Sequence, residues 1–212
     1  MFNMARLSGS AVFQALISNT SWVGLVRILA SFGSAALAGY TIAIRVVLFA
    51  LLPAWGLPNA AATLVGQNLG AGRPERAETS VWLACWYNMV FLSAVGCVFV
   101  VFPAPLVSLF TSDPDVAAIA VRGLRIVSIG FPSYAYAMIL TQAFNGAGDT
   151  VTPTVINIFC FWLWEIPLAY GLTRIAGLGP SGVFWSIAIA YSTMAAVSAV
   201  LFRRGRWKLK RV

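Results

Sequence analysis

The sequence contains no histidine and few charged residues. Of its 212 residues only 9% are charged and 3 are cysteines. Because Cys85, Cys97 and Cys160 all lie inside apolar runs, neither a metal-ligand cluster nor a disulfide framework is indicated, and we expect all three to be small buried residues. No nucleophile–base pair and no pair of carboxylates within a helix is present, so the sequence gives no support to an enzyme.

Apolar residues make up most of the chain instead. Hydrophobic residues account for 60% of the sequence, and the mean hydropathy of +0.85 lies far outside the range of soluble domains. The apolar runs are long and not alternating, which favours helices over a membrane β-barrel. A crossing helix needs about 20 apolar residues, so the length allows about six crossings and no separate soluble domain. The predicted class is an all-α membrane protein.

The polar and proline-containing breaks between the apolar runs define six helices. They form one six-helix transmembrane lobe over residues 1–202, followed by a basic cytoplasmic tail over 203–212. Because proline removes a backbone donor and clashes with the preceding turn, Pro53 and Pro58 should kink the second helix and Pro132 the fourth. The approximate predicted bounds are 9–36, 40–65, 79–102, 116–144, 153–172 and 183–202.

The charges predict how the lobe is oriented. The formal net charge is +8, but six of the fourteen cations lie in the tail, which is typical of a membrane orientation signal and argues against a nucleic-acid partner. Six crossings place the N-terminus, the stretch 66–76, the turn 145–150 and the tail on one side. Of the cations on the opposite side, only Arg174 is clearly outside a helix. We therefore expect a multi-pass protein of the cytoplasmic membrane, surrounded by the lipid bilayer, with no removable signal peptide and both termini inside the cell.

The glycine-rich stretch 66–76 has two interpretations. Glycine-rich loops can cradle a phosphate with backbone amides at a helix start. This stretch, however, follows a helix and lacks the Gly-Lys-Ser/Thr ending of a nucleotide-binding loop. The sequence therefore favours a tight turn between two helices, in which Arg73 and Arg76 meet anionic lipid or the carbonyls of a helix end.

The same tripeptide occurs at a second turn. Gly-Ala-Gly at 70–72 recurs at 146–148, and each copy joins the end of a proline-broken helix to the next helix. We expect the two turns to be built alike, and we expect both Gly70 and Gly72 to require glycine.

Both turns resemble the loop signatures of the MATE (multidrug and toxic compound extrusion) transporters. Further similar segments follow in the family's order at 35–40, 110–115, 166–170 and 177–183. The resemblance covers nearly the whole chain but only the second half of a family member. The matching loop residues are Gly66, Gln67, Asn68, Gly70, Gly72 and Arg73 in the first turn, and Asn145, Gly146, Gly148 and Asp149 in the second.

The resemblance implies that the chain is the C-terminal six-helix lobe of a two-lobe efflux antiporter. Such a transporter exports cationic or amphipathic compounds in exchange for protons or sodium, with no cofactor besides the coupling ion. The N-terminal lobe or a second copy would be needed to complete the cleft. Two alternatives remain open: an inactive or partner-dependent membrane assembly or lipid-binding subunit, and a homodimeric six-helix carrier.

One intramembrane acid, Glu165, is the candidate for cation coupling. The helices 9–36 and 116–144, in which the sodium-coupled branch of the family carries carboxylates, contain no Asp or Glu. The alternative for Glu165 is a purely structural carboxyl group, paired with an arginine or kept protonated.

Other polar side chains in apolar helices are candidates to line a cavity, with hydrogen bonding between helices as the alternative for each. Among them, Gln14, Asn19 and Tyr136 are the strongest, because the resemblance implies a cleft lined by the first, second and fourth helices of this lobe. The full set is Gln14, Asn19, Asn59, Tyr134, Tyr136, Gln142 and Asn157.

Overall fold

The computed structural model describes residues 2–209, with side chains at 9 and 12–208. Nearly all described residues are helical, and no strand occurs among them. The elements are α1 (Phe2–Ala30), α2 (Ser34–Ala54), α3 (Gly56–Gly70), α4 (Pro74–Val101), α5 (Pro103–Ser108), α6 (Pro114–Ile129), α7 (Phe131–Gly146), α8 (Val151–Asn157), the π-helical segment η1 (Ile158–Glu165), α9 (Ile166–Tyr170), the π-helical segment η2 (Gly171–Ile175), α10 (Ser181–Arg203) and the 3₁₀ turn η3 (Arg206–Leu209).

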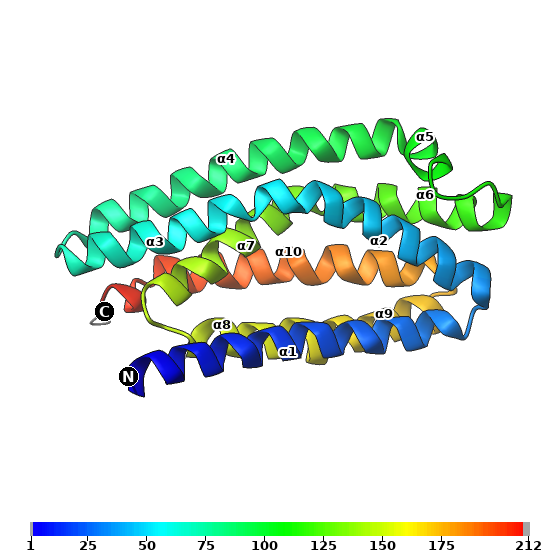
Figure 1. Ribbon diagram of the computed structural model, residues 1–212. Coiled ribbons are helices and arrows are strands. Elements are labelled where there is room, and N and C mark those ends of the chain that lie inside the picture. Colours follow the sequence, from blue (N-terminus) through cyan, green and yellow to red (C-terminus); the bar gives the residue numbers. More distant parts are fainter. Residues whose placement is uncertain (1, 210–212) are drawn as a thin grey trace.

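The helices lie side by side in one elongated bundle (Figure 1). α10 runs through its middle and packs against α6, α7, η1 and α9. Both ends of the described chain, the α3–α4 turn and the α7–α8 turn lie at the same end of the bundle, which we call the basic end. The opposite end is called the far end. The cations that define the basic end are Arg73, Arg76, Arg203, Arg204, Arg206 and Lys208.

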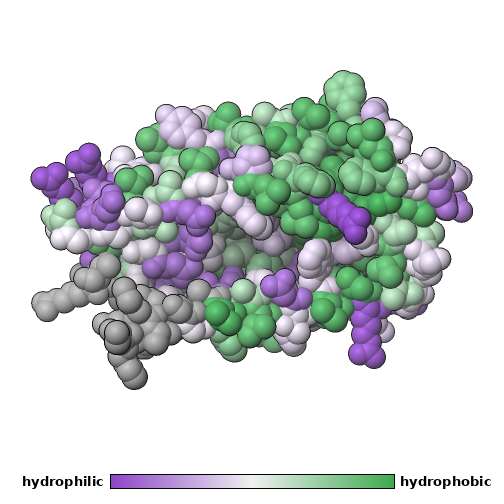
Figure 2. Space-filling model, viewed as in Figure 1, coloured by the Kyte–Doolittle hydropathy of each residue, from purple (hydrophilic) through white to green (hydrophobic). Residues whose placement is uncertain are grey.

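The helices have the length and composition of membrane spans. Five helical segments are long and apolar enough to cross a bilayer, and the bent pair α6–α7 makes six when it is counted as one span. Hydrophobic residues cover much of the face in Figure 2, while hydrophilic residues lie mostly towards its two ends. Because large apolar side chains such as Trp86 and Val98 of α4 point outward, this surface suits lipid. The predicted all-α membrane class is confirmed.

The two predicted helix breaks are present. The second apolar segment is interrupted at Trp55, between α2 and α3, next to Pro53 in the last turn of α2. The fourth breaks at Gly130, two residues before Pro132, and its halves α6 and α7 differ in direction by 57°. Proline explains both positions, because its ring excludes the backbone hydrogen bond that would continue the helix.

Several predicted bounds were wrong. The first helix ends at Ala30 and not near residue 36, because Gly33 adopts a φ of 97° and starts the next helix at Ser34. The fifth runs from Val151 to Ile175 and not from 153 to 172. It contains the π-helical segments η1 and η2, which we did not predict, and its extension places Arg174 in a helical turn.

The interior consists of two hydrophobic clusters. One lies around Tyr40, Phe131 and Phe184, and the other around Phe144 and Phe202 near the basic end. Cys85 and Cys160 belong to the second cluster, but Cys97 is exposed on α4. The expectation that every cysteine is buried was therefore wrong for Cys97, whose small apolar side chain is tolerated on a lipid-facing surface.

The two glycine turns are built alike, as predicted. The amide of Arg73 donates to the carbonyl of Asn68 at 2.8 Å, and the amide of Asp149 donates to the carbonyl of Phe144 at 2.9 Å. The residue before each donor is a glycine with positive φ, 69° at Gly72 and 73° at Gly148. This five-residue closure over a left-handed glycine is the Schellman motif that ends many helices.

The hydrogen bonds of the first turn also decide between its two interpretations. The amides of residues 71–73 all donate to carbonyls of α3, so they are not available to a phosphate and the turn serves to end a helix. Gly72 needs glycine because of its positive φ. The expectation for Gly70 was wrong, since it lies in α3 without a positive φ and has open space around it.

The glycines before the turns bring α3 and α7 close together. A Cβ on Gly146 would lie 2.3 Å from the carbonyl oxygen of Ala62 and 2.6 Å from its Cα. A Cβ on Gly66 would in turn lie 3.3 Å from the carbonyl oxygen of Gly146. The backbones therefore touch here, as small residues permit in membrane helix packing.

Replacing Gly146 with alanine should separate α3 from α7, because the backbone of Ala62 leaves no room for the new methyl group. We expect the free energy of unfolding to fall by about 1–3 kcal/mol, measured by thermal unfolding of the purified protein in detergent. Gly70→Ala is the matched control in the same kind of turn, and it should leave the transition unchanged. Equal effects of the two substitutions would contradict the close approach.

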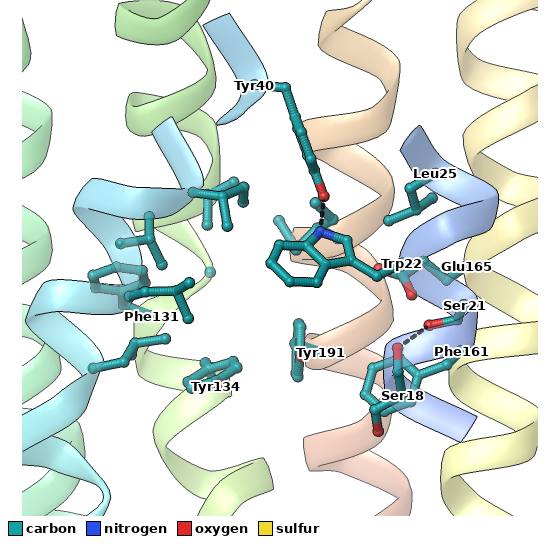
Figure 3. Close-up of a pocket in the computed structure, with 18 of the residues that line it drawn as sticks. Ser18, Ser21, Trp22, Leu25, Tyr40, Phe131, Tyr134, Phe161, Glu165 and Tyr191 are labelled. Carbon is teal, nitrogen blue, oxygen red and sulfur yellow. Dashed lines mark hydrogen bonds between the residues drawn. The ribbon is translucent and has the colours of Figure 1, made fainter. Parts of the chain in front are cut away.

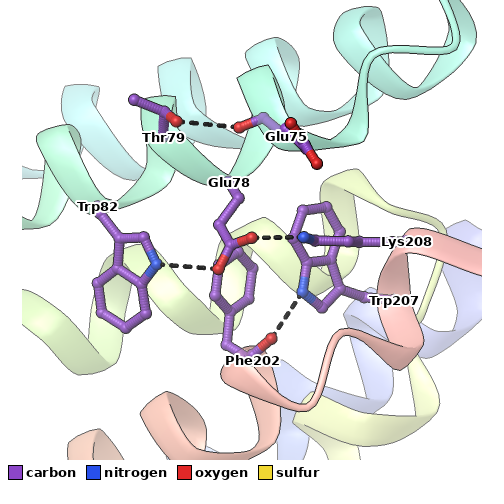
Figure 4. Close-up of polar contacts among 7 residues, drawn as sticks. All are labelled: Glu75, Glu78, Thr79, Trp82, Phe202, Trp207 and Lys208. Atoms are coloured by element: carbon purple, nitrogen blue, oxygen red, sulfur yellow. Dashed lines mark hydrogen bonds and ion pairs between the residues drawn. The ribbon is translucent and has the colours of Figure 1, made fainter.

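The segment after α10 folds back onto the bundle at the basic end (Figure 4). The Trp207 ring is 1% exposed, stacks on the Phe202 ring with centroids 4.5 Å apart, and donates its indole N–H to the Phe202 carbonyl at 2.9 Å. The Lys208 ammonium lies 2.5 Å from the carboxylate of Glu78 on α4. Part of the predicted basic tail is therefore packed against the bundle, while Lys210 and Arg211 lie outside the described residues.

Removing this aromatic anchor should destabilise the lobe. Trp207→Ala should lower the free energy of unfolding by about 3–5 kcal/mol, as expected for loss of a buried large aromatic residue, and this can be followed in the same thermal assay. Trp86→Ala, on the outward face of α4, should cost less than about 1 kcal/mol. A Trp207→Ala protein as stable as the Trp86→Ala protein would show that the tail is not anchored by its tryptophan.

Candidate functional site

α1 is held to the bundle mainly on one side, and cavities lie on its other side. It packs against α2, α8, η1 and α9, and residues of α1, α2, α7 and α10 surround the first of the cavities beside it (Figure 3). The first cavity has a volume of about 380 Å³ and we call it the carboxylate cavity. Its polar and aromatic lining residues are Ser18, Asn19, Ser21, Trp22, Tyr40, Trp55, Phe131, Tyr134, Phe161, Glu165 and Tyr191.

Glu165 is the one acidic residue among the described residues that line the carboxylate cavity. It is 3% exposed and forms the last residue of η1, on the same side of the cavity as Ser21 and Trp22 of α1 (Figure 3). Among the described residues, no arginine or lysine forms an ion pair with it and none donates a hydrogen bond to it. The structural interpretation that required an arginine partner therefore has no support in the described part of the chain.

Two aromatic residues of the cavity wall, Trp22 and Tyr40, are joined by a hydrogen bond. The indole N–H of Trp22 donates a hydrogen bond to the hydroxyl oxygen of Tyr40, which joins α1 to α2. Tyr40 in turn packs against Phe184, with ring centroids 5.7 Å apart. The bond fixes the Trp22 ring over the middle of the cavity.

A second cavity of about 510 Å³ lies beside the first and extends towards the α7–α8 turn; we call it the amide cavity. Carboxamide side chains dominate its polar lining, and no charged residue occurs among the described residues around it. The two cavities share Ser18, Trp55, Tyr134, Phe161 and Tyr191. The rings of Tyr134 and Tyr191 meet edge to face with centroids 4.4 Å apart, so this pair stands between the cavities.

Hydrogen-bonded amides join three helices along the amide cavity. Gln14 of α1 donates to Asn145 Oδ1 at 3.3 Å, and Asn145 Nδ2 donates back to Gln14 Oε1 at 3.4 Å. Asn145 also donates to Gln142 Oε1 at 2.7 Å, and Gln142 donates to Asn59 Oδ1 of α3 at 3.4 Å. Gln14 reaches the Thr150 carbonyl as well, at 3.3 Å. α1 is thus tied through side chains to α7, the α7–α8 turn and α3.

The structure brings most of the predicted cavity residues together. Gln14, Asn59, Gln142 and Asn157 line the amide cavity, Asn19 lines the carboxylate cavity, and Tyr134 lines both. Tyr136 lines neither of these two cavities; its ring lies near Trp82 at a centroid distance of 6.5 Å, in the second hydrophobic cluster. The expectation for Tyr136 was therefore wrong, because it points from α7 towards α4 and not towards α1.

The loop residues of the two glycine turns are not part of the cavities, except Asn145. Gln67 is exposed and the side chain of Asn68 donates to the Leu64 carbonyl of its own helix. Asp149 accepts a hydrogen bond from the Thr152 hydroxyl at 2.7 Å at the start of α8. These residues shape the turns at the basic end.

Several lining residues were not predicted from the sequence. The most informative are Ser18, Ser21 and Trp22, which follow Gln14 on α1 at helical spacing and form one polar stripe. Counting serine and tryptophan together with Gln14 would have located this face of the first helix. No comparable pattern in the sequence indicated that Trp55 and Tyr191 line a cavity.

Fold and site together define the class: a multi-pass helical membrane protein with a buried carboxyl group beside a largely apolar cavity between its helices. The MatE family model matches residues 11–171. The chain therefore belongs to the MatE family.

Similar proteins are full-length members of that family. The chain is 26% identical to the Probable multidrug resistance protein NorM of Thermotoga maritima, over 98% of this chain and 45% of that protein. It is 30% identical to the protein of the same name from Pseudomonas putida, over 85% of this chain and 39% of that protein. The chain thus spans less than half the length of these relatives.

Solved structures show the same fold. The chain superposes on the MATE transporter ClbM, in complex with Rb⁺, with a TM-score of 0.91 at 20% identity, over 99% of this chain and 50% of ClbM. A MOP superfamily transporter from Pyrococcus furiosus gives a TM-score of 0.89 at 21% identity, over 96% of this chain and 46% of that one. The resemblance to one half of a MATE transporter is thereby confirmed for the fold.

The amide contacts between α1 and α7 can be tested by cross-linking. In a protein whose native cysteines are replaced by alanine, Gln14→Cys and Asn145→Cys should be joined within one chain by a short bis-methanethiosulfonate reagent, detected by mass spectrometry. Val12→Cys combined with Asn145→Cys is the control, because Val12 lies two residues away on the outward face of α1 and is 60% exposed. Equal linking of both pairs would contradict the observed packing of α1.

Proposed function

We propose that the chain is the C-terminal six-helix lobe of a MATE-type multidrug efflux antiporter, which exports cationic or amphipathic compounds in exchange for protons or sodium ions. The observation that carries this proposal is a buried carboxyl group, Glu165, which faces a cavity in a chain of the MatE family and has no ionic partner in the part of the chain that the structure describes. Ionisable residues at such depth in spanning helices mark ion and substrate pathways.

Glu165 would couple export of the substrate to entry of the ion, because the substrate and the ion would compete for its carboxylate. A single carboxylate binds a proton, a sodium ion or the positive group of a substrate, but not two of them at once. Loading with the coupling ion therefore weakens binding of the exported cation. The rings of Trp22, Tyr40 and Tyr191 line the same cavity, and aromatic faces attract organic cations.

The remaining wall of a central cleft would come from another lobe. The chain matches less than half of its full-length relatives, so the N-terminal lobe or a second copy of this chain is the partner we infer. Six of the eleven cations with described side chains lie at the basic end, and the sequence adds Arg6, Lys210 and Arg211 near the two termini. From the positive-inside rule we infer that this end, with both termini, faces the cytoplasmic side of the cell membrane. We infer that the chain acts as a carrier and not as an enzyme.

Replacing Glu165 with glutamine keeps the size of the side chain and removes its charge. When the chain is expressed with its native neighbouring coding sequence in an efflux-deficient bacterium, we expect Glu165→Gln to slow proton-gradient-driven ethidium efflux at least tenfold. Glu75→Gln, on the exposed first turn of α4, should leave the rate unchanged.

The outcomes separate the proposal from its alternatives. Unchanged gradient-driven efflux in the Glu165→Gln protein would remove this residue from the coupling mechanism. Efflux by the chain expressed alone would favour a homodimeric carrier, and cysteines introduced in α1 and α2 should then cross-link between copies. If neither arrangement exports ethidium, the chain is an assembly subunit and the antiporter proposal fails.

A further inference from the structure

The amide cavity contains one polar atom that nothing in the described chain satisfies. Asn157 is 6% exposed, and its Oδ1 atom is buried without a hydrogen-bond partner. The residue lines the amide cavity. Leaving a buried acceptor unpaired costs free energy, and such atoms are rare in folded proteins, so this one calls for an explanation.

The other amides of the cavity do not offer the same opportunity. Gln14, Asn145, Gln142 and Asn59 bond to one another in sequence. These bonds hold four carboxamides in place as part of the wall. Asn157 stands apart from them at the last residue of α8, where the winding changes from α to π. Changes of this kind occur frequently at functional sites.

The cavity that Asn157 lines contains several aromatic residues, and no charged residue occurs among the described residues around it. Tyr134, Tyr191 and Phe161 line the cavity beside it and also line the carboxylate cavity. Phe161 and Tyr191 lie with ring centroids 5.4 Å apart. Glu165 is the eighth residue after Asn157, a distance on the order of 10 Å along the helix. A ligand in the amide cavity therefore lies against aromatic residues that also line the carboxylate cavity.

We propose that the amide cavity is a neutral binding subsite, in which Asn157 Oδ1 accepts a hydrogen bond from an uncharged N–H or O–H group of an aromatic ligand. The ligand's ring lies against the aromatic wall shared by the two cavities, and its positive charge, where it has one, lies towards Glu165. The direction of transport rests on the proposed function, whereas ligand binding at Asn157 does not.

Two cationic acridine dyes provide a matched test. Proflavine carries two primary amines on its ring, and acridine orange carries dimethylamino groups in their place, so only proflavine offers exocyclic N–H donors. We expect the purified protein in detergent to bind proflavine about tenfold more tightly by fluorescence anisotropy, which corresponds to about 1.4 kcal/mol. In the Asn157→Leu protein, proflavine should bind more weakly and acridine orange as before, so that the two dyes bind about equally.

Two further variants keep the test decisive. Asn157→Ala should remove the preference in the same way if the leucine variant does not fold. Asn88→Leu is the matched control, because Asn88 Oδ1 is also buried and unpaired but the residue lines neither cavity; it should retain the preference. Equal binding of the two dyes by the unmodified protein, or a preference that survives both changes at Asn157, would overturn the subsite.

The subsite and the antiporter proposal can be rejected independently, because dye binding and ethidium efflux are measured separately. A dye preference that depends on Asn157, found in a protein without ethidium efflux, would sustain the subsite and reject the antiporter. Efflux that depends on Glu165, without any dye preference, would reject only the subsite.

Discussion

Hydrocarbon offers no hydrogen-bond partner, so a polar side chain in a spanning helix must bond to a backbone carbonyl or face other polar groups. Thr41, Thr173 and Ser192 take the first course and donate to a carbonyl of the preceding turn. The second course concentrates amides, tyrosines and the carboxyl group of Glu165 along the two cavities beside α1. The positions of the cavities therefore follow from the need to keep polar groups away from lipid.

Local features of the fold could be read from the sequence, and features set by packing could not. Pro53 and Pro132 interrupt their helices through the proline ring itself, which does not depend on neighbouring helices. Gly72 and Gly148 likewise close their turns through their own φ angles. The π-helical winding of η1 could not be predicted from the sequence, because it changes hydrogen-bond partners without requiring any particular residue. The end of the first helix was also ambiguous, since several nearby glycines could have stopped it.

The candidate site shows the same division. Gln14, Asn157 and Glu165 stood out because amide and acidic groups are costly in apolar helices. Tyr134 and Tyr136 looked alike in sequence, but two residues correspond to about 200° around an α-helix, so only one of them can face α1. Serines were missed because a serine that bonds to its own helix is tolerated at the lipid surface. Choosing among these residues required knowledge of which helices are neighbours.

The span Val151–Ile175 holds more residues than a bilayer needs. Its 25 residues would measure about 38 Å as an α-helix, whereas the hydrocarbon core is about 30 Å thick. The i→i+5 bonds of η1 and η2 give wider and shorter turns. The span is therefore shorter than an α-helix with the same number of residues. Rewinding η1 into an α-helix would move Glu165 towards the far end while Asn157, which precedes η1, keeps its place. The winding of one helix thus sets the separation between the acid and the amide.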